Sequence, residues 1–202
     1  MNKAFHLLPI LSFAAVAFAA DPTPPDKYEV LIGEELAGSG FVIRYGTGFL
    51  GVASLHQFDG KAPRTLEPLD GDAITLDTTK VIKQKDVQAL PVKSPSPKLQ
   101  FLNYNPNFTL RAGDEVIILG PAGDCVPGVL TPKGMTAGTY KSADGPRQLE
   151  ARAGKPIMMA GGSGGPVLHK QSGAVIGVLL TADDGKQARV VGFETLCLPK
   201  PK

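Results

Sequence analysis

The chain has 202 residues, of which 43% are hydrophobic and 20% charged, and glycine and proline together make up about one residue in five. The formal net charge is only +2 and no block of five like charges occurs, so nucleic acid is not an expected partner. Beyond the N-terminus no apolar run is long enough to cross a membrane. The composition predicts one turn-rich globular domain that needs no metal, cofactor or disulfide framework to fold.

The first twenty residues differ from all the others. Lys3 precedes an apolar run, Ala4 to Ala20, in which the small residues Ala17 and Ala19 fit a cleavage site after Ala19. We therefore predict a signal peptide over residues 1–19 and export of residues 20–202 to the periplasm or the medium, free of the membrane once the signal is removed. The alternative is an uncleaved anchor, against which the interrupted apolar run counts, since a span needs ~20 residues.

Export would permit a disulfide, and the chain has two cysteines, Cys125 and Cys197. The sequence leaves two alternatives open, a Cys125–Cys197 bridge or two buried thiols, because it does not fix the distance between them.

Short runs rich in strand-forming residues recur along the chain between Gly, Pro and Asp turns, and no long run has the 3.6-residue period of a helix. This pattern predicts an all-β, antiparallel fold of paired barrels or sandwiches. The expected strands are residues 28–32, 39–45, 49–54, 73–77, 87–92, 115–119, 166–169, 174–181 and 188–193.

The segment SPSPK, residues 94–98, has two prolines in four residues and predicts an extended connector. We place a boundary there, between an N-terminal barrel of about residues 28–93 and a C-terminal barrel of about residues 99–198. The lysine-rich segment 80–86 is expected to form a solvated strand edge.

The most specific motif is AGGSGGPV, residues 160–167, where one serine lies among four glycines before an apolar strand. Glycines let the backbone approach a substrate, so that successive N–H groups can converge beside the hydroxyl of Ser163. A serine nucleophile also needs a base. Outside the predicted signal the histidines are His56 and His169, and His169 lies on the strand that leaves the glycine turn, which makes His56 the better candidate.

A histidine base is held in its working tautomer by a carboxylate. Asp86 stands directly before the strand 87–92, at a junction that can face a cleft, and Asp77 is the second candidate. The alternative for both is ordinary surface charge.

These blocks together resemble the trypsin-like, chymotrypsin-fold serine peptidases, and within them the compact exported bacterial type related to HtrA peptidases. The resemblance lies in residues 38–58, 85–92, 111–123 and 161–180, in the family's order and spacing. It implies two antiparallel six-stranded barrels with the active site in the cleft between them. Because the chain ends at Lys202 soon after its last expected strand, we expect no PDZ domain of the kind that HtrA peptidases append.

The resemblance also implies roles for single residues. His56 would be the general base, Asp86 its orienting carboxylate and Ser163 the nucleophile, with the N–H groups of Gly161 and Ser163 as the oxyanion hole. The side chain before the scissile bond would be received by uncharged residues and would be small or aliphatic. The residues expected to line this substrate pocket are Ile157, Leu179, Leu180 and Thr181.

The function expected from these residues is serine endopeptidase activity on proteins and peptides through an acyl-enzyme. Leu55 before the histidine and Gln88 after the aspartate depart from the family pattern. These departures motivate an alternative from another class, a catalytically inactive protease-fold module that holds peptide without cutting it.

Overall fold

A computed structural model describes part of the chain: residues 28–33, 38–68, 71–105, 114–118, 128–130, 136–141, 147–151, 163–183, 187–192 and 198. Within these ranges the regular structure is β-strand, apart from one 3₁₀ turn, η2, at His56–Phe58. None of the described segments is a helix with the length and apolar character of a membrane span. The predicted signal peptide, Cys125, Ile157, Gly161 and Cys197 lie outside the described residues.

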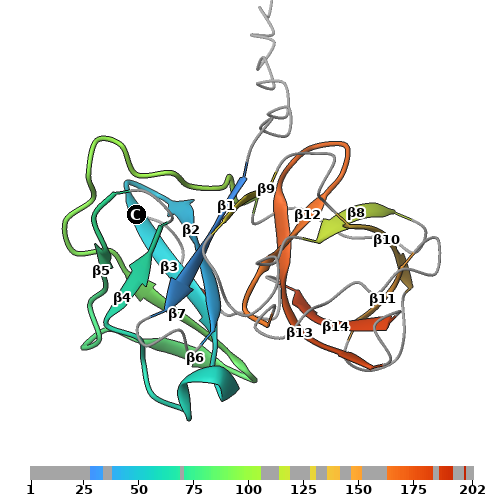
Figure 1. The fold of residues 1–202 in the computed structure, drawn as a ribbon, viewed down its shortest axis with the longest axis horizontal. Helices are drawn as coiled ribbons and strands as arrows, with labels where there is room; N and C mark the ends of the chain where they lie inside the picture. Colours follow the sequence, from blue (N-terminus) through green and yellow to red (C-terminus); the bar gives the residue numbers. More distant parts are fainter. Residues whose placement is uncertain are drawn as a thin grey trace, which may run out of the picture.

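The first half of the chain forms one antiparallel sheet with the strand order β5-β4-β1-β2-β3-β7-β6 (Figure 1). The chain turns back repeatedly at Gly, Asp and Lys positions, so most strands that follow one another in the sequence also pair in the sheet. The strands of this half are β1 (Tyr28–Gly33), β2 (Ser39–Tyr45), β3 (Gly48–Ser54), β4 (Thr65–Glu67), β5 (Ile74–Thr75), β6 (Ile82–Gln84) and β7 (Val87–Pro91).

The second half forms a closed barrel in the order β10-β11-β14-β13-β12-β8, drawn on the right of Figure 1. Closure leaves the barrel no free sheet edge. Its strands, with β9, are β8 (Glu115–Ile118), β9 (Gly128–Leu130), β10 (Thr136–Lys141), β11 (Arg147–Ala151), β12 (Pro166–His169), β13 (Val175–Asp183) and β14 (Gln187–Gly192).

Two features join the halves. β9 pairs antiparallel with β1, so a strand from the second half extends the first sheet to eight strands. A segment after the predicted connector lies along both halves: Leu102 bridges to Ile43 of β2 and Tyr104 bridges to Val175 of β13.

One apolar cluster also extends across both halves. Phe41 and Val52 of β2 and β3 share it with Leu168, Val178 and Leu180 of β12 and β13, and all five are buried. Burial of a large apolar side chain contributes about 1.5–3 kcal/mol. Val87 of β7 belongs to the same cluster, so β3, the start of β7 and β12 are held against one another by a common core.

The all-β, antiparallel prediction is confirmed, and each of the nine expected strands overlaps an observed one. The lysine-rich segment contains β6, which ends the sheet path as an edge strand. Among the described residues the first half is a path of seven strands with β9 paired to β1, and its end strands β5 and β6 are not paired with each other, so the expected second six-stranded barrel stays a prediction. The single bridge Leu76↔Val92 links the residues that follow β5 and β7. The domain boundary at 94–98 stays a prediction.

Candidate active site

His56 stands on a short loop after β3, residues 55–60, which we call the histidine loop. The loop is closed by hydrogen bonds from the backbone N–H groups of Phe58 and Gly60 to the carbonyl oxygen of Leu55 (3.1 and 3.0 Å). Within the loop the 3₁₀ turn η2 is capped by Asp59, whose φ of 50° lies in the left-handed region. The tight turn leaves the imidazole at the surface, with 41% of the side chain exposed.

Asp86 reaches His56 because of the register between β3 and β7. Ser54 pairs with Val87, so the residues just after Ser54 lie beside the residue just before Val87. The two-residue turn Lys85–Asp86 between β6 and β7, with φ of 52° at Lys85, then presents the carboxylate to the histidine loop. The backbone confirms this proximity, since the N–H of Leu55 donates to the carbonyl oxygen of Asp86 at 2.9 Å.

The two carboxylate oxygens of Asp86 hold His56 at two points. One accepts the backbone N–H of His56 at 2.9 Å, and the other lies 2.5 Å from the ring nitrogen Nδ1. A carboxylate can only accept there, so Nδ1 carries the hydrogen and the Nε2 nitrogen is the one left to take up a proton. The pair has the chemistry of an oriented base.

Ser163 opens the serine turn, Ser163–Gly165, which leads into β12. The N–H of Gly164 donates to the carbonyl oxygen of Leu179 (2.7 Å), and the N–H of Leu179 donates to that of Gly165 (2.9 Å). On the other side, the N–H of Ser39 donates to the carbonyl oxygen of Ser163 at 3.3 Å. The serine turn is thus held between β13 of the second half and β2 of the first.

Gly164 shows how closely the serine turn approaches the histidine loop. Its φ is +94°, and a Cβ added there would lie 2.1 Å from the carbonyl oxygen of Ser39 and 3.2 Å from the backbone nitrogen of Ser54. Ser54 is two residues before His56. The fold therefore brings His56 and Asp86 into contact and places the serine turn beside Ser54, at the start of the histidine loop.

This contact predicts a large effect for Gly164→Ala. Both the left-handed φ and the short distance to a backbone oxygen oppose a methyl group, so we expect a loss of at least about 2 kcal/mol in unfolding free energy. Gly60→Ala is the matched control, because Gly60 has a φ of +73° but nothing within 4 Å of the added Cβ. Urea unfolding of both variants should show a clearly larger loss for Gly164→Ala. Equal losses would mean that the backbone conformation alone, and not the contact with β2, accounts for the effect.

The hydroxyl of Ser163 does not bond to His56 in this structure. It donates to the backbone carbonyl oxygen of Leu180, and the residue is buried, with 8% of its surface exposed. Within the described ranges His56 and Ser163 share no hydrogen bond. The His56 imidazole is therefore held by Asp86, while the Ser163 hydroxyl points to β13.

The predicted pocket strand runs beside the serine turn. Leu179 exchanges backbone hydrogen bonds with the turn, and Thr181 follows on the same strand, β13. The side chain of Leu180, however, packs in the apolar cluster shared by the two halves. Of Leu180 it is the carbonyl oxygen that faces Ser163, so its predicted role in lining a side-chain pocket needs correction.

The other candidate base and orienting residue lie elsewhere. His169 ends β12, and its Nδ1 is 2.9 Å from the hydroxyl of Ser172 in a separate turn. Asp77 accepts both the hydroxyl (2.6 Å) and the backbone N–H (3.1 Å) of Thr79, and these bonds, with the nearby charge of Lys80, hold the pKa of its carboxyl below the usual value. Asp86, and not Asp77, contacts the histidine.

Gln88, which the sequence presented only as a departure from a family pattern, holds the histidine loop in place. It is fully buried, and its Nε2 donates to the carbonyl oxygens of Ser54 (3.1 Å) and Lys61 (3.0 Å), the residues that flank the loop. Lys83 adds a bond from its ammonium group to the carbonyl oxygen of Gly60 at 2.6 Å. The signal for Gln88 was a polar residue inside an otherwise apolar strand.

The change Gln88→Met should lower the unfolding free energy by about 1–3 kcal/mol, because two buried carbonyl oxygens lose their donor. Gln100→Met, at an exposed position, controls for removal of an amide and should change it by less than about 0.5 kcal/mol. Chemical denaturation measures both. A Gln88→Met protein as stable as the original would show that the two bonds do not hold the loop.

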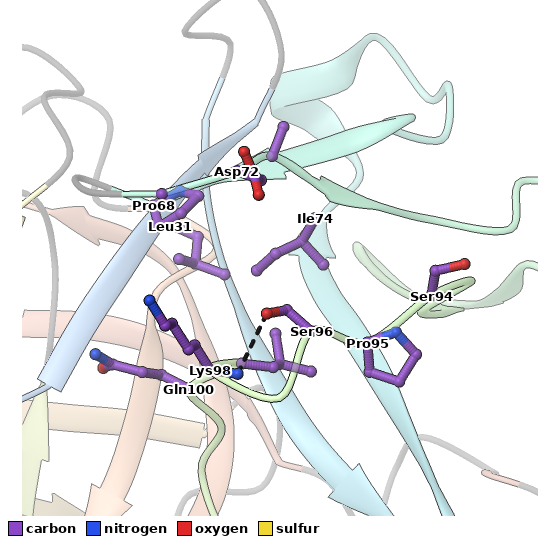
Figure 2. A pocket seen from close by; sticks show the side chains of 12 residues that line it. Leu31, Pro68, Asp72, Ile74, Ser94, Pro95, Ser96, Lys98 and Gln100 are labelled. Atoms are coloured by element: carbon purple, nitrogen blue, oxygen red, sulfur yellow. Dashed lines mark hydrogen bonds between the residues drawn. The ribbon is translucent and has the colours of Figure 1, made fainter.

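A cavity of about 430 Å³ lies apart from this site (Figure 2). It opens between the β4–β5 loop and the predicted connector, and neither His56, Asp86 nor Ser163 lines it. In the part of the chain that the structure describes, no group of three or more His, Cys, Asp or Glu side chains is placed to hold a metal ion. The residues that line the cavity are Leu31, Pro68, Gly71, Asp72, Ala73, Ile74, Ser94, Pro95, Ser96, Lys98, Leu99 and Gln100.

Comparison with known proteins gives one kind of match. No protein-family model matches the chain, and no curated protein matches it. Among solved structures, the Rv3671c protease from M. tuberculosis, in its active form, is similar over 100% of this chain and 96% of its own, with a TM-score of 0.53 and 19% sequence identity. The chain shares the fold of this protease. At this identity the likeness concerns the fold alone, and the predicted similarity to HtrA peptidases stays a prediction.

Proposed function

We propose that this chain is a serine endopeptidase that hydrolyses peptide bonds in proteins through His56, Asp86 and Ser163. The observation that carries the proposal is the two-point contact between Asp86 and His56, with Nδ1 2.5 Å from the carboxylate, beside a serine turn that packs on Ser54. A surface histidine has no need of such an arrangement. A base that must take up a proton at Nε2 does.

In the proposed reaction the Ser163 hydroxyl turns from the carbonyl of Leu180 toward His56, a rotation about one side-chain bond between staggered positions. Its oxygen attacks the substrate carbonyl carbon while Nε2 of His56 takes the hydroxyl proton. The negative oxygen of the tetrahedral intermediate is received by the N–H groups of Gly161 and Ser163. His56 then gives its proton to the leaving amine, and water hydrolyses the acyl-enzyme by the same steps.

The substrate class follows from the strand beside the serine. Leu179 and Thr181 carry no charge, and neither does Ile157, so the site favours a small or aliphatic residue before the scissile bond. The substrates are proteins or peptides, and no cofactor takes part. We further propose that residues 1–19 direct export, so that the enzyme acts in the periplasm or outside the cell.

A fluorophosphonate probe tests the proposal directly, because it phosphorylates a serine only when a base activates it. The chain without residues 1–19 should be labelled at Ser163, located by mass spectrometry of its peptides, and heat-denatured protein should not. Native protein that remains unlabelled at Ser163 would overturn the assignment of the nucleophile.

One observation favours the inactive peptide-binding module instead: the Ser163 hydroxyl donates to the carbonyl oxygen of Leu180. If that bond is permanent, the protein should bind peptides, seen as a change in fluorescence polarisation of a labelled peptide, and yet resist the probe. Labelling at Ser163 would exclude this second function.

A further inference from the structure

The residue after His56 has an unusual set of contacts for a side chain beside a base. The side-chain oxygen of Gln57 accepts the hydroxyl of Ser54 at 3.0 Å and the backbone N–H of Ser39 at 3.3 Å. A backbone N–H can only donate, so the atom that faces it is the amide oxygen and not the nitrogen. Both acceptor positions of that oxygen are thereby used.

The same N–H of Ser39 also donates to the carbonyl oxygen of Ser163, again at 3.3 Å. One hydrogen shared between two acceptors accounts for the length of both bonds. The Ser39 N–H therefore links the histidine loop to the serine turn, because it donates both to the side-chain oxygen of Gln57 and to the carbonyl oxygen of Ser163. Ser39 and Ser54 are fully buried, so water does not compete at these atoms.

The backbone is built to admit the Gln57 side chain. At Gly38 an added Cβ would lie 2.2 Å from the side-chain oxygen of Gln57 and 2.7 Å from its Cβ. The space where any other residue would carry a side chain is filled by Gln57. The side chain of Gln57 thus fills the space that the absent side chain of Gly38 leaves, where the histidine loop meets β2.

We propose that Gln57 is a positioning residue: its amide oxygen ties the histidine loop to the serine turn through the Ser39 N–H and so fixes the separation of base and nucleophile. This inference rests on the proposed peptidase function. Gln57 touches no reacting atom. A displacement of about 1 Å between reacting groups can lower a rate about 100-fold, which gives such a tie its importance.

The test compares Gln57→Met, which keeps the length but removes the acceptor, with Gln57→Glu, which keeps an acceptor oxygen in the same place. We expect the rate of fluorophosphonate labelling per folded molecule to fall tenfold to 100-fold in Gln57→Met and to return to within about fivefold of the original in Gln57→Glu. In peptide hydrolysis the loss should appear in kcat and leave KM nearly unchanged. Ile74→Ala, at the sheet edge, controls for a general loss of stability.

A second measurement follows the tie without any reaction. Hydrogen exchange of the Ser39 amide should be at least tenfold faster in Gln57→Met and unchanged in Gln57→Glu. Normal labelling of Gln57→Met, or an equal loss in Ile74→Ala, would overturn the proposal. A wild-type protein that is never labelled would instead sink the proposed function, and the exchange rates would still decide on the tie: faster exchange supports it and equal exchange overturns it.

Discussion

Ser163→Ala is expected to lower kcat for the hydrolysis of an unfolded protein such as fluorescent casein by about 10⁶-fold, the loss seen when a triad loses its nucleophile. The triad acts as a unit, so His56 and Asp86 cannot compensate. Folding should survive, because the hydroxyl makes one hydrogen bond within the described structure, to Leu180, and such a bond contributes about 1 kcal/mol. Initial rates with purified variant and wild type, together with thermal unfolding, measure both effects.

The matched control is Ser172→Ala. Ser172 is also buried, at 5% exposure, and its hydroxyl bonds to His169 in a turn away from the triad. The same chemical change there should leave the hydrolysis rate within about twofold, since a site remote from the reacting groups alters only stability. Hydrolysis that persists in Ser163→Ala, once contaminating protease is removed by a second purification, would show that another residue is the nucleophile.

Some strands could not be predicted from the sequence, and β11 and β9 share one physical reason for this. β11, Arg147–Ala151, reads RQLEA, which holds good helix formers and no β-branched residue. It is a strand because β10 and β14 pair with it on both sides and close the barrel. β9 is three residues long and pairs with β1, far away in sequence. Such partners are set by tertiary structure, which a local pattern does not contain.

The residues of the candidate site also fall into those that the sequence could predict and those that it could not. Ser163 could be predicted because glycines at a close approach have a local signature, and Gly164 with its φ of +94° against Ser39 shows why one of them is required. Asp86 could be predicted from its place before a strand. The roles of Gln57 and Gln88 could not, because each depends on which backbone atoms the register of β2, β3 and β7 places next to the side chain. The structural role of a buried glutamine can be assigned only when its hydrogen-bond partners are known.

Asp86→Asn should reduce kcat about 10⁴-fold while leaving the fold intact. The amide oxygen of asparagine can still accept the backbone N–H of His56, which in the original protein lies 2.9 Å from a carboxylate oxygen of Asp86. The amide nitrogen, however, would donate toward Nδ1 where the carboxylate accepted at 2.5 Å. The imidazole would then carry its hydrogen on Nε2, the atom that has to receive the serine proton, and the imidazolium formed during attack would lose its partner.

Asp77→Asn separates this effect from a general loss of negative charge. Asp77 is the other aspartate considered for the role, and it caps its own turn through Thr79. Since the carboxylate does not contact His56, its change to an amide should leave kcat within about threefold. The kcat values of both variants, measured at one pH on the same peptide, decide between the two residues. An unchanged kcat for Asp86→Asn with a large loss for Asp77→Asn would mean that the 2.5 Å contact between Asp86 and His56 is not the one that orients the base.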